Sequence, residues 1–205
     1  MTITTRSGKG SPLTHAELDG NFTDLDTRTK SGWKDLVAPL TAAGVSVANT
    51  PAMTAFGPSG LREEYAFDVG DYVFCQAFHV NHDIKPGGLA YVHVHWSTNG
   101  TSTASVKWEL QISRALGHQQ ANFGAPTSVY VTQAGAGSAW RHMVAEVSVG
   151  DALTLTEPDE LILVTLRRVT NGGTDNTDTV FGLTVDFHYE ADRDSTPNKA
   201  PNFYT

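Results

Sequence analysis

Two histidines in an alternating strand pattern are the residues of this chain best suited to chemistry. His93 and His95 are separated only by Val94. Because successive side chains of a β-strand point to opposite faces, both imidazoles are expected on the same face. Imidazole nitrogens are good ligands for Zn, Fe and Cu. The pair is therefore the first candidate for a binding or catalytic site.

A glycine ahead of the pair extends it to a spacing found in metalloenzymes. Gly87, His93 and His95 read G-x5-H-x-H, which resembles the first half of the metal motif of cupins, a family of jelly-roll-like barrels. That motif continues with a glutamate four or five positions after the second histidine, where this chain has Asn99 and Gly100. The later Pro-x-Gly and histidine part is absent as well. The cupin match is thus incomplete.

His79 and His82 belong to the neighbouring strand-like run, which a hairpin would place beside His93 and His95. A metal site of four imidazoles is one interpretation. The interpretation we favour is structural, because histidines on a half-buried strand also hydrogen-bond to neighbouring loops or line a subunit interface. We therefore expect these four as interface histidines, with no bound metal, no cofactor and no catalytic activity.

Acidic groups provide no clearer catalytic arrangement. Neighbouring acids on a strand point to opposite faces, and the remaining ones fall in turns or in the tail. The groups concerned are Glu63-Glu64, Glu157/Asp159/Glu160 and Asp192/Asp194. A Ca²⁺ site in the loop 171–179 and a simple polar turn explain its Asp and Asn residues equally well. Aromatic residues in or beside loops are a better lead to binding, with a carbohydrate or protein receptor as the ligand: Phe123, Tyr130 and Trp140.

Composition narrows the function classes. The 205 residues are 40% hydrophobic and only 18% charged, with a net charge of −8. Lys and Arg are not clustered, so we expect no nucleic-acid binding. No apolar run approaches the roughly 20 residues that span a bilayer, and the N-terminus lacks the apolar core of a signal peptide. The single Cys75 forms no internal disulfide. We expect a soluble protein made in the cytoplasm, without a membrane partner.

The elements that position these residues are mostly strands. From residue 61 the hydrophobic pattern has a period of two, interrupted by turn residues such as Asn99-Gly100. Eight runs follow one another without a helical pattern between them, which predicts an all-β fold with two packed sheets. The predicted strands span residues 61–69, 72–80, 89–96, 105–114, 127–132, 139–149, 160–169 and 180–189.

One short amphipathic helix is predicted ahead of the strands, over residues 14–29. Thr14 and Glu17 have the spacing of a capping box, and the residues on either side have that of a hydrophobic staple. A helix of this length is marginal in water by itself, so its apolar stripe needs a partner. We expect three copies to pack together, or the helix to dock on another protein. The predicted anchor residues are Leu13, Leu18, Phe22 and Leu25.

Two stretches resemble known proteins. The segment LTHAELDGNFTDLDTRT resembles the N-terminal segment of many tailed-bacteriophage fibre, head-fibre and decoration proteins, and FHVNHDIKPGGLAYVHVHW resembles the β domain of small phage virion proteins built as jelly rolls. The resemblance implies an eight-stranded jelly-roll-like β-sandwich with a short N-terminal anchor. The expected regions are an arm and anchor helix (1–32), a connecting segment (33–60), the jelly-roll domain (61–190) and a C-terminal tail (191–205).

The function expected from this resemblance is structural. The chain would be a capsid decoration protein, a cement or head-fibre knob, that is anchored as a homotrimer to the major capsid protein or another virion protein and stabilises the shell. The alternative is a tail-fibre or head-fibre receptor-binding protein that recognises a host surface glycan. Many copies over the shell favour decoration, and a few at one vertex favour a fibre. A cupin-like metalloenzyme is the third hypothesis, which metal analysis decides.

Overall fold

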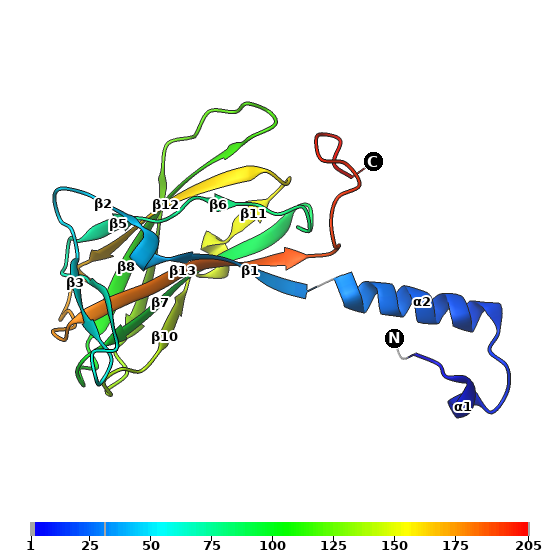
Figure 1. Ribbon diagram of the computed structural model, residues 1–205, viewed down its shortest axis with the longest axis horizontal. Coiled ribbons are helices and arrows are strands. Elements are labelled where there is room, and N and C mark those ends of the chain that lie inside the picture. Colours follow the sequence, from blue (N-terminus) through cyan, green and yellow to red (C-terminus); the bar gives the residue numbers. More distant parts are fainter. Residues whose placement is uncertain (1–2, 31, 205) are drawn as a thin grey trace.

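The computed structural model describes residues 3–30 and 32–204. Two antiparallel sheets pack face to face, and an N-terminal helix extends from one end of this sandwich (Figure 1). The helical elements are α1 (Arg6–Lys9), α2 (His15–Lys30) and the 3-10 turns η1 (Leu40–Ala42) and η2 (Val149–Asp151). The strands are β1 (Gly32–Pro39), β2 (Gly44–Val45), β3 (Ala52–Phe56), β4 (Arg62–Ala66), β5 (Tyr72–Phe74), β6 (Phe78–His79), β7 (Gly88–Thr98), β8 (Ser105–Leu116), β9 (Thr127–Ala134), β10 (Met143–Glu146), β11 (Leu153–Leu155), β12 (Glu160–Val169) and β13 (Val180–Ala191).

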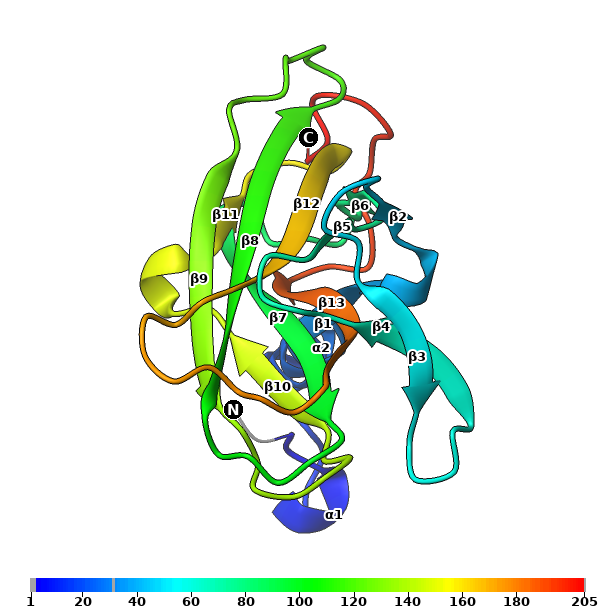
Figure 2. The same ribbon diagram turned by 90° about the vertical axis from the view of Figure 1, so that its left-hand side faces the viewer.

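The strand order is that of a jelly roll. The first sheet runs β10-β7-β13-β4-β3, with β1 also paired to β13 and β11 to β7. The second sheet runs β2-β5-β12-β8-β9, with β6 also paired to β12. Figure 2 shows both layers, with β8, β9 and β12 in one and β7, β10 and β13 in the other. If the eight predicted runs are numbered in sequence order, the first sheet has the order 1-8-3-6 and the second has the order 2-7-4-5. The chain therefore crosses repeatedly from one sheet to the other, as the two Greek keys of a jelly roll require.

The core lies between the inner faces of the two sheets. Large side chains from both sheets meet there without solvent contact, including Trp96, Trp108 and Phe187. On β13 the predicted alternation is confirmed, since Val185 and Tyr189 are buried in the same core. Burial of apolar surface on this scale is the main stabilising contribution to a sandwich of this size. It also fixes which residues of each strand point outward.

The segment 33–60, which we expected only to connect the helix to the sandwich, contributes strands to both sheets. β1 pairs with β13 along its whole length, β3 with β4, and β2 with β5. With β11, and because the predicted run 72–80 divides into β5 and β6, the described residues have thirteen strands rather than eight. The pattern of β1 is hard to interpret because apolar residues occupy both of its faces. Leu36 packs on the core, whereas Trp33 and Val37 are exposed on the opposite face. The spacing of these three residues in the sequence is also that of one face of a helix.

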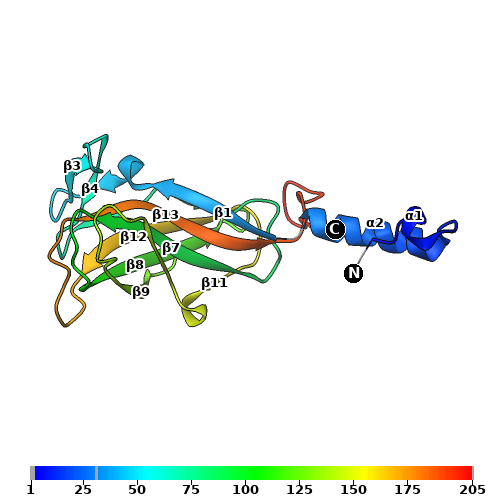
Figure 3. The same ribbon diagram turned by 90° about the horizontal axis from the view of Figure 1, so that it is seen from below.

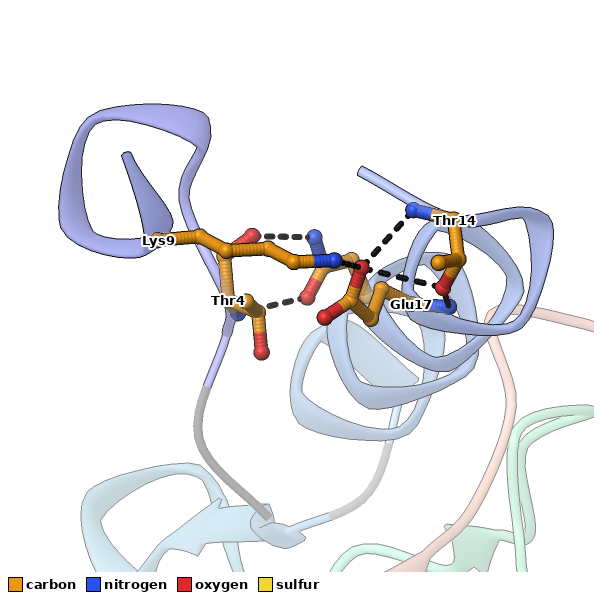
Figure 4. A network of polar contacts seen from close by, with 5 residues as sticks. Thr4, Lys9, Thr14 and Glu17 are labelled. Carbon is orange, nitrogen blue, oxygen red and sulfur yellow. Dashed lines mark hydrogen bonds and ion pairs between the residues drawn. The ribbon is translucent and has the colours of Figure 1, made fainter. Parts of the chain in front are cut away.

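The predicted N-terminal helix is present, and its first turn is capped as expected. The amide of Glu17 donates to the Thr14 hydroxyl (3.2 Å), and the Glu17 carboxylate accepts from the Thr14 amide (2.7 Å). These are the two reciprocal bonds of a capping box. Figure 4 shows this network, in which Lys9 also pairs with the Glu17 carboxylate. The capping box therefore determines where α2 begins.

The residues before α2 are not the extended arm that their polar composition indicates. They form the one-turn helix α1 and fold back along α2 (Figure 4). The Asn21 side chain holds this return, because its amide donates to the Thr4 carbonyl and its carbonyl accepts from the Thr4 amide, both at 2.7 Å. Gly10 ends α1 in the left-handed conformation, with φ of 70°. Asn21, together with the pairing of Lys9 with Glu17, thus holds a segment that has no buried residues of its own against α2.

Replacing Leu40 by alanine tests whether the segment after the helix belongs to the sandwich. Leu40 is 0% exposed, and truncation of a buried leucine costs about 2–5 kcal/mol of unfolding free energy. Leu61→Ala is the matched control, because Leu61 is 90% exposed and should change stability by about 0.5 kcal/mol or less. Urea denaturation measures both. Equal stability of the two variants would contradict the inclusion of this segment in the core.

Candidate functional site

Histidines and carboxylates meet on the outer face of the first sheet. The strand register places Glu146 of β10 opposite His93 of β7, and His93 opposite Asp186 of β13. One row along, His188 of β13 lies opposite Asp35 of β1. We call this group the outer-face cluster, and its members are Asp35, His93, His95, His142, Glu146, Asp186 and His188. Its four strands lie side by side, so backbone pairing alone brings together residues far apart in the sequence.

His93 is at the centre of the cluster and is covered by its neighbours. Its side chain is only 4% exposed although it points away from the core. Nε2 contacts the Glu146 carboxylate, and Nδ1 faces Asp186 at 3.8 Å from Oδ2. The His188 ring packs against it with 3.9 Å between ring centroids. A buried imidazole therefore lies between two carboxylates.

Asp186 and His95 make the second close contact of the cluster. Nε2 of His95 lies 2.8 Å from Oδ1 of Asp186, whose side chain is 6% exposed. The opposite nitrogen of His95, Nδ1, lies 2.7 Å from Nε2 of His142. Burying a carboxylate is costly unless cations or hydrogen bonds compensate its charge. The surrounding imidazoles of His95 and His93 are therefore the groups that can compensate the buried charge of Asp186.

The edge of the cluster carries two aromatic residues. The rings of Trp33 and Tyr91 pack at 5.7 Å between centroids, and Trp33 is 56% exposed. Together with Glu146 and His188 they line a pocket of about 290 Å³. Burial lowers the pKa of His188, which favours its neutral form. The pocket therefore combines apolar aromatic rings with groups that can accept and donate hydrogen bonds.

The structure brings together only half of the four predicted histidines. His93 and His95 share the outer face as expected, but His79 and His82 lie at another place and contact Asp159. The interpretation as a four-imidazole site is therefore wrong. The reason is topological, because the run that contains His79 belongs to the second sheet, where it pairs with β12 instead of β7. Their role at a subunit interface stays a prediction.

Sequence reasoning missed several members of the outer-face cluster. Asp186 and His188 alternate across Phe187 in the same manner as His93 and His95. That repeated alternation was the available signal, although only the register shows that the two strands are adjacent. For Asp35, His142 and Glu146 the sequence carries no comparable pattern.

A second histidine group surrounds Asp159. His118 Nε2 lies 2.7 Å from Asp159 Oδ2, while Nε2 of His79 and of His82 lie 3.2 and 3.3 Å from Oδ1. Phe203 of the C-terminal tail is 3% exposed and packs against the rings of His82 and His118. This group therefore fastens the tail to the sandwich, which is a structural role.

Three of the four predicted anchor residues lie on α2, which extends beyond the sandwich (Figure 3), and Leu13 precedes this helix. Phe22 is 69% exposed, Leu25 50% and Leu18 38%, whereas Leu13 is half-buried. Three large apolar side chains are thus accessible on one helix, a feature that is common where a protein contacts another chain. Their assignment as the anchor stays a prediction. Among the described residues, no helix has the length and hydropathy needed to cross a bilayer.

The loop aromatics do not form a comparable site. Trp140 packs against Phe56 and Phe181, with ring centroids 5.4 and 5.8 Å apart. The Tyr130 hydroxyl donates to Glu109 (3.0 Å), and its side chain, 47% exposed, lies on β9, whereas Phe123 lies in a loop and is 46% exposed. The outer face of the first sheet is thus the better candidate for binding.

Comparison with known proteins does not assign a function to this chain. No protein-family model and no curated protein matches it. A carbohydrate-binding module CBM36 in complex with calcium and xylotriose is 13% identical over 74% of this chain and 98% of that chain, with a TM-score of 0.42. A family 35 carbohydrate binding module from Clostridium thermocellum is 14% identical over 74% and 97%, with a TM-score of 0.41. Likeness at this level carries no argument about function, which must come from the site.

The titration of Glu17 tests the capped start of α2. The pairing with Lys9 and the hydrogen bonds from Thr14 lower the pKa of Glu17 to about 2. Because the folded-state pKa is depressed, the stabilisation is complete above the ordinary value of 4.5 and is lost as the pH falls toward 2. NMR titration of the side chain measures it. Lys9→Ala should raise this pKa part of the way, while titration of the wild type near 4.5 would contradict the network.

Proposed function

We propose that this chain is a recognition module of a tailed-bacteriophage particle, attached by α2 and presenting the outer face of the first sheet to a glycan of the host surface. The single observation that carries the proposal is the pocket that Trp33 and Tyr91 form with Glu146 and His188. The role is binding without catalysis. The capsid-decoration role stays a prediction. It would use the same helix for attachment, but it would not involve a ligand bound in this pocket.

The chemistry of the pocket suits a sugar. A pyranose ring has apolar C–H faces that stack on an accessible aromatic ring, and a rim of hydroxyls that both donate and accept hydrogen bonds. Trp33 provides the accessible ring, since more than half of its surface is exposed. The Glu146 carboxylate accepts hydrogen bonds, and the His188 imidazole can donate or accept them. Both groups sit on strands, which hold them rigidly against the ring.

The anchor follows from the exposed stripe of α2. Leu18, Phe22 and Leu25 follow a four-then-three spacing, which is that of a coiled-coil seam. Three copies that bury this stripe together would remove the exposed apolar surface and would display three sandwiches at one end. The capping box supports this arrangement, because it preforms the helix before association. In the virion, the trimer would attach to the capsid or to the tail.

Replacing Trp33 by alanine tests the glycan site. The variant should bind host surface polysaccharide at least about tenfold more weakly, because the stacking surface is lost. Phe123→Ala is the control, as it removes another exposed aromatic ring away from this face. Binding of purified protein to immobilised polysaccharide measures both, and unfolding midpoints confirm the folds. If Trp33→Ala binds as tightly as the wild type while Phe123→Ala binds weakly, the pocket has been misassigned.

Substitutions on α2 test the anchor. Phe22→Ala with Leu25→Ala should convert a trimer into a folded monomer that no longer joins particles, because the seam loses most of its apolar area. Thr23→Ala on the same helix should leave the trimer intact. Light scattering after size-exclusion chromatography gives the mass. Deletion of residues 1–30 should have the same effect, since β1 begins at Gly32. If either the shortened chain or the substituted chain still joined particles at full occupancy, the assignment of α2 as the anchor would be wrong.

A further inference from the structure

We propose that the outer-face cluster binds one divalent transition-metal ion between His93, His95 and Asp186. One ligand atom from each of these residues lies within 4.8 Å of the other two. The residues come from two adjacent strands, and the pairing of Asp186 with His93 is fixed by the β7–β13 register. The ion would act independently of any sugar, so this proposal does not need the glycan role to be correct.

Two buried atoms of the proposed site make no hydrogen bond, although one of them, Oδ1 of Asp186, has Nε2 of His95 2.8 Å away. Within the part of the chain that the structure describes, Nδ1 of His93 and Oδ1 of Asp186 neither donate nor accept a hydrogen bond. Their side chains are 4% and 6% exposed, so water has little access to them. Buried polar atoms without partners are rare in folded proteins, and a bound ion can supply the missing interaction. Both atoms belong to residues that each offer a ligand atom within 4.8 Å of the others.

The spacing of the donor atoms suits a small ion. His95 Nε2 lies 2.8 Å from Asp186 Oδ1 without making a hydrogen bond, and His93 Nδ1 lies 3.8 Å from Asp186 Oδ2. Zinc bonds of about 2.0–2.1 Å in a tetrahedron separate neighbouring ligand atoms by about 3.3 Å. The two observed separations bracket this value, so small rotations of the side chains would complete the site.

The outer ring nitrogens are held as metal-binding histidines usually are. Glu146 contacts Nε2 of His93, which leaves Nδ1 of that ring toward Asp186. His142 lies 2.7 Å from Nδ1 of His95, which leaves Nε2 toward the same carboxylate. A partner on the far nitrogen fixes the orientation of a ligating imidazole and raises its basicity. Both candidate ligands therefore present a ring nitrogen to the same carboxylate, that of Asp186.

The donor set selects the class of metal. Two imidazoles and one carboxylate suit Zn²⁺ or Fe²⁺, whereas Ca²⁺ and Mg²⁺ prefer oxygen ligands alone. Three protein ligands leave a coordination position for water or another group. A divalent cation would also balance the negative charge that Asp35, Glu146 and Asp186 concentrate on this face.

Zinc titration of the untagged full-length protein tests the proposal. After treatment with EDTA and desalting, calorimetry should give close to one Zn²⁺ per chain, Co²⁺ should give a visible absorption band, and Ca²⁺ should not bind. His95→Gln should weaken Zn²⁺ binding by at least about tenfold. His118→Gln is the matched control, because it removes an imidazole from the other histidine group.

The choice of His95 keeps the test decisive. Its side chain is 22% exposed, so its replacement is less disruptive than that of His93, and the unfolding midpoint verifies the fold. Weakened binding in His95→Gln with wild-type binding in His118→Gln supports the site. Absence of stoichiometric Zn²⁺ binding by the wild type, or equal binding by both variants, overturns it and leaves the imidazoles as partners of the carboxylates alone.

Discussion

The antiparallel pairing of β13 with β7 on one side and β1 on the other is the constraint on which the rest of the structure depends. A strand paired on both edges has a fixed register, and with a side-chain period of two each residue is committed to one face. A shift by one residue would bring Asp186 and His188 into the core and would expose Phe187. The hydrophobic cost of that exchange holds the polar residues outward. The packing of the core thus determines the geometry of the outer-face cluster.

The division of the chain into two parts follows from where apolar surface is buried. The sandwich buries many of its large side chains between its own two sheets. Helix α2 has good local capping but leaves most of its apolar stripe accessible. A helix that is already ordered and has accessible apolar side chains is suited to association, because binding then loses little further conformational entropy. The attachment that we propose for α2 and the display that we propose for the sandwich would therefore use separate elements of one chain.

Much of the fold could be predicted because the signals are local. Each of the eight predicted runs contains strand residues, and the capping box that starts α2 is visible as Thr14 and Glu17. The site could be predicted only in part, because it depends on which strands are neighbours. His93 and His95 share a face by alternation alone, whereas their neighbours on β13 and β10 are fixed by pairings between strands far apart in the sequence. Strand β1 was missed because both of its faces are apolar.

Interstrand nuclear Overhauser contacts of β13 are the most direct measurement of this account. The structure predicts that Asp186 lies opposite His93 on one side and opposite Val37 on the other. Observation of both pairings would confirm the arrangement from which the pocket and the metal site are derived. Contacts displaced by one residue, with Phe187 opposite His93, would contradict it, because the clustered side chains would then belong to opposite faces of the sheet.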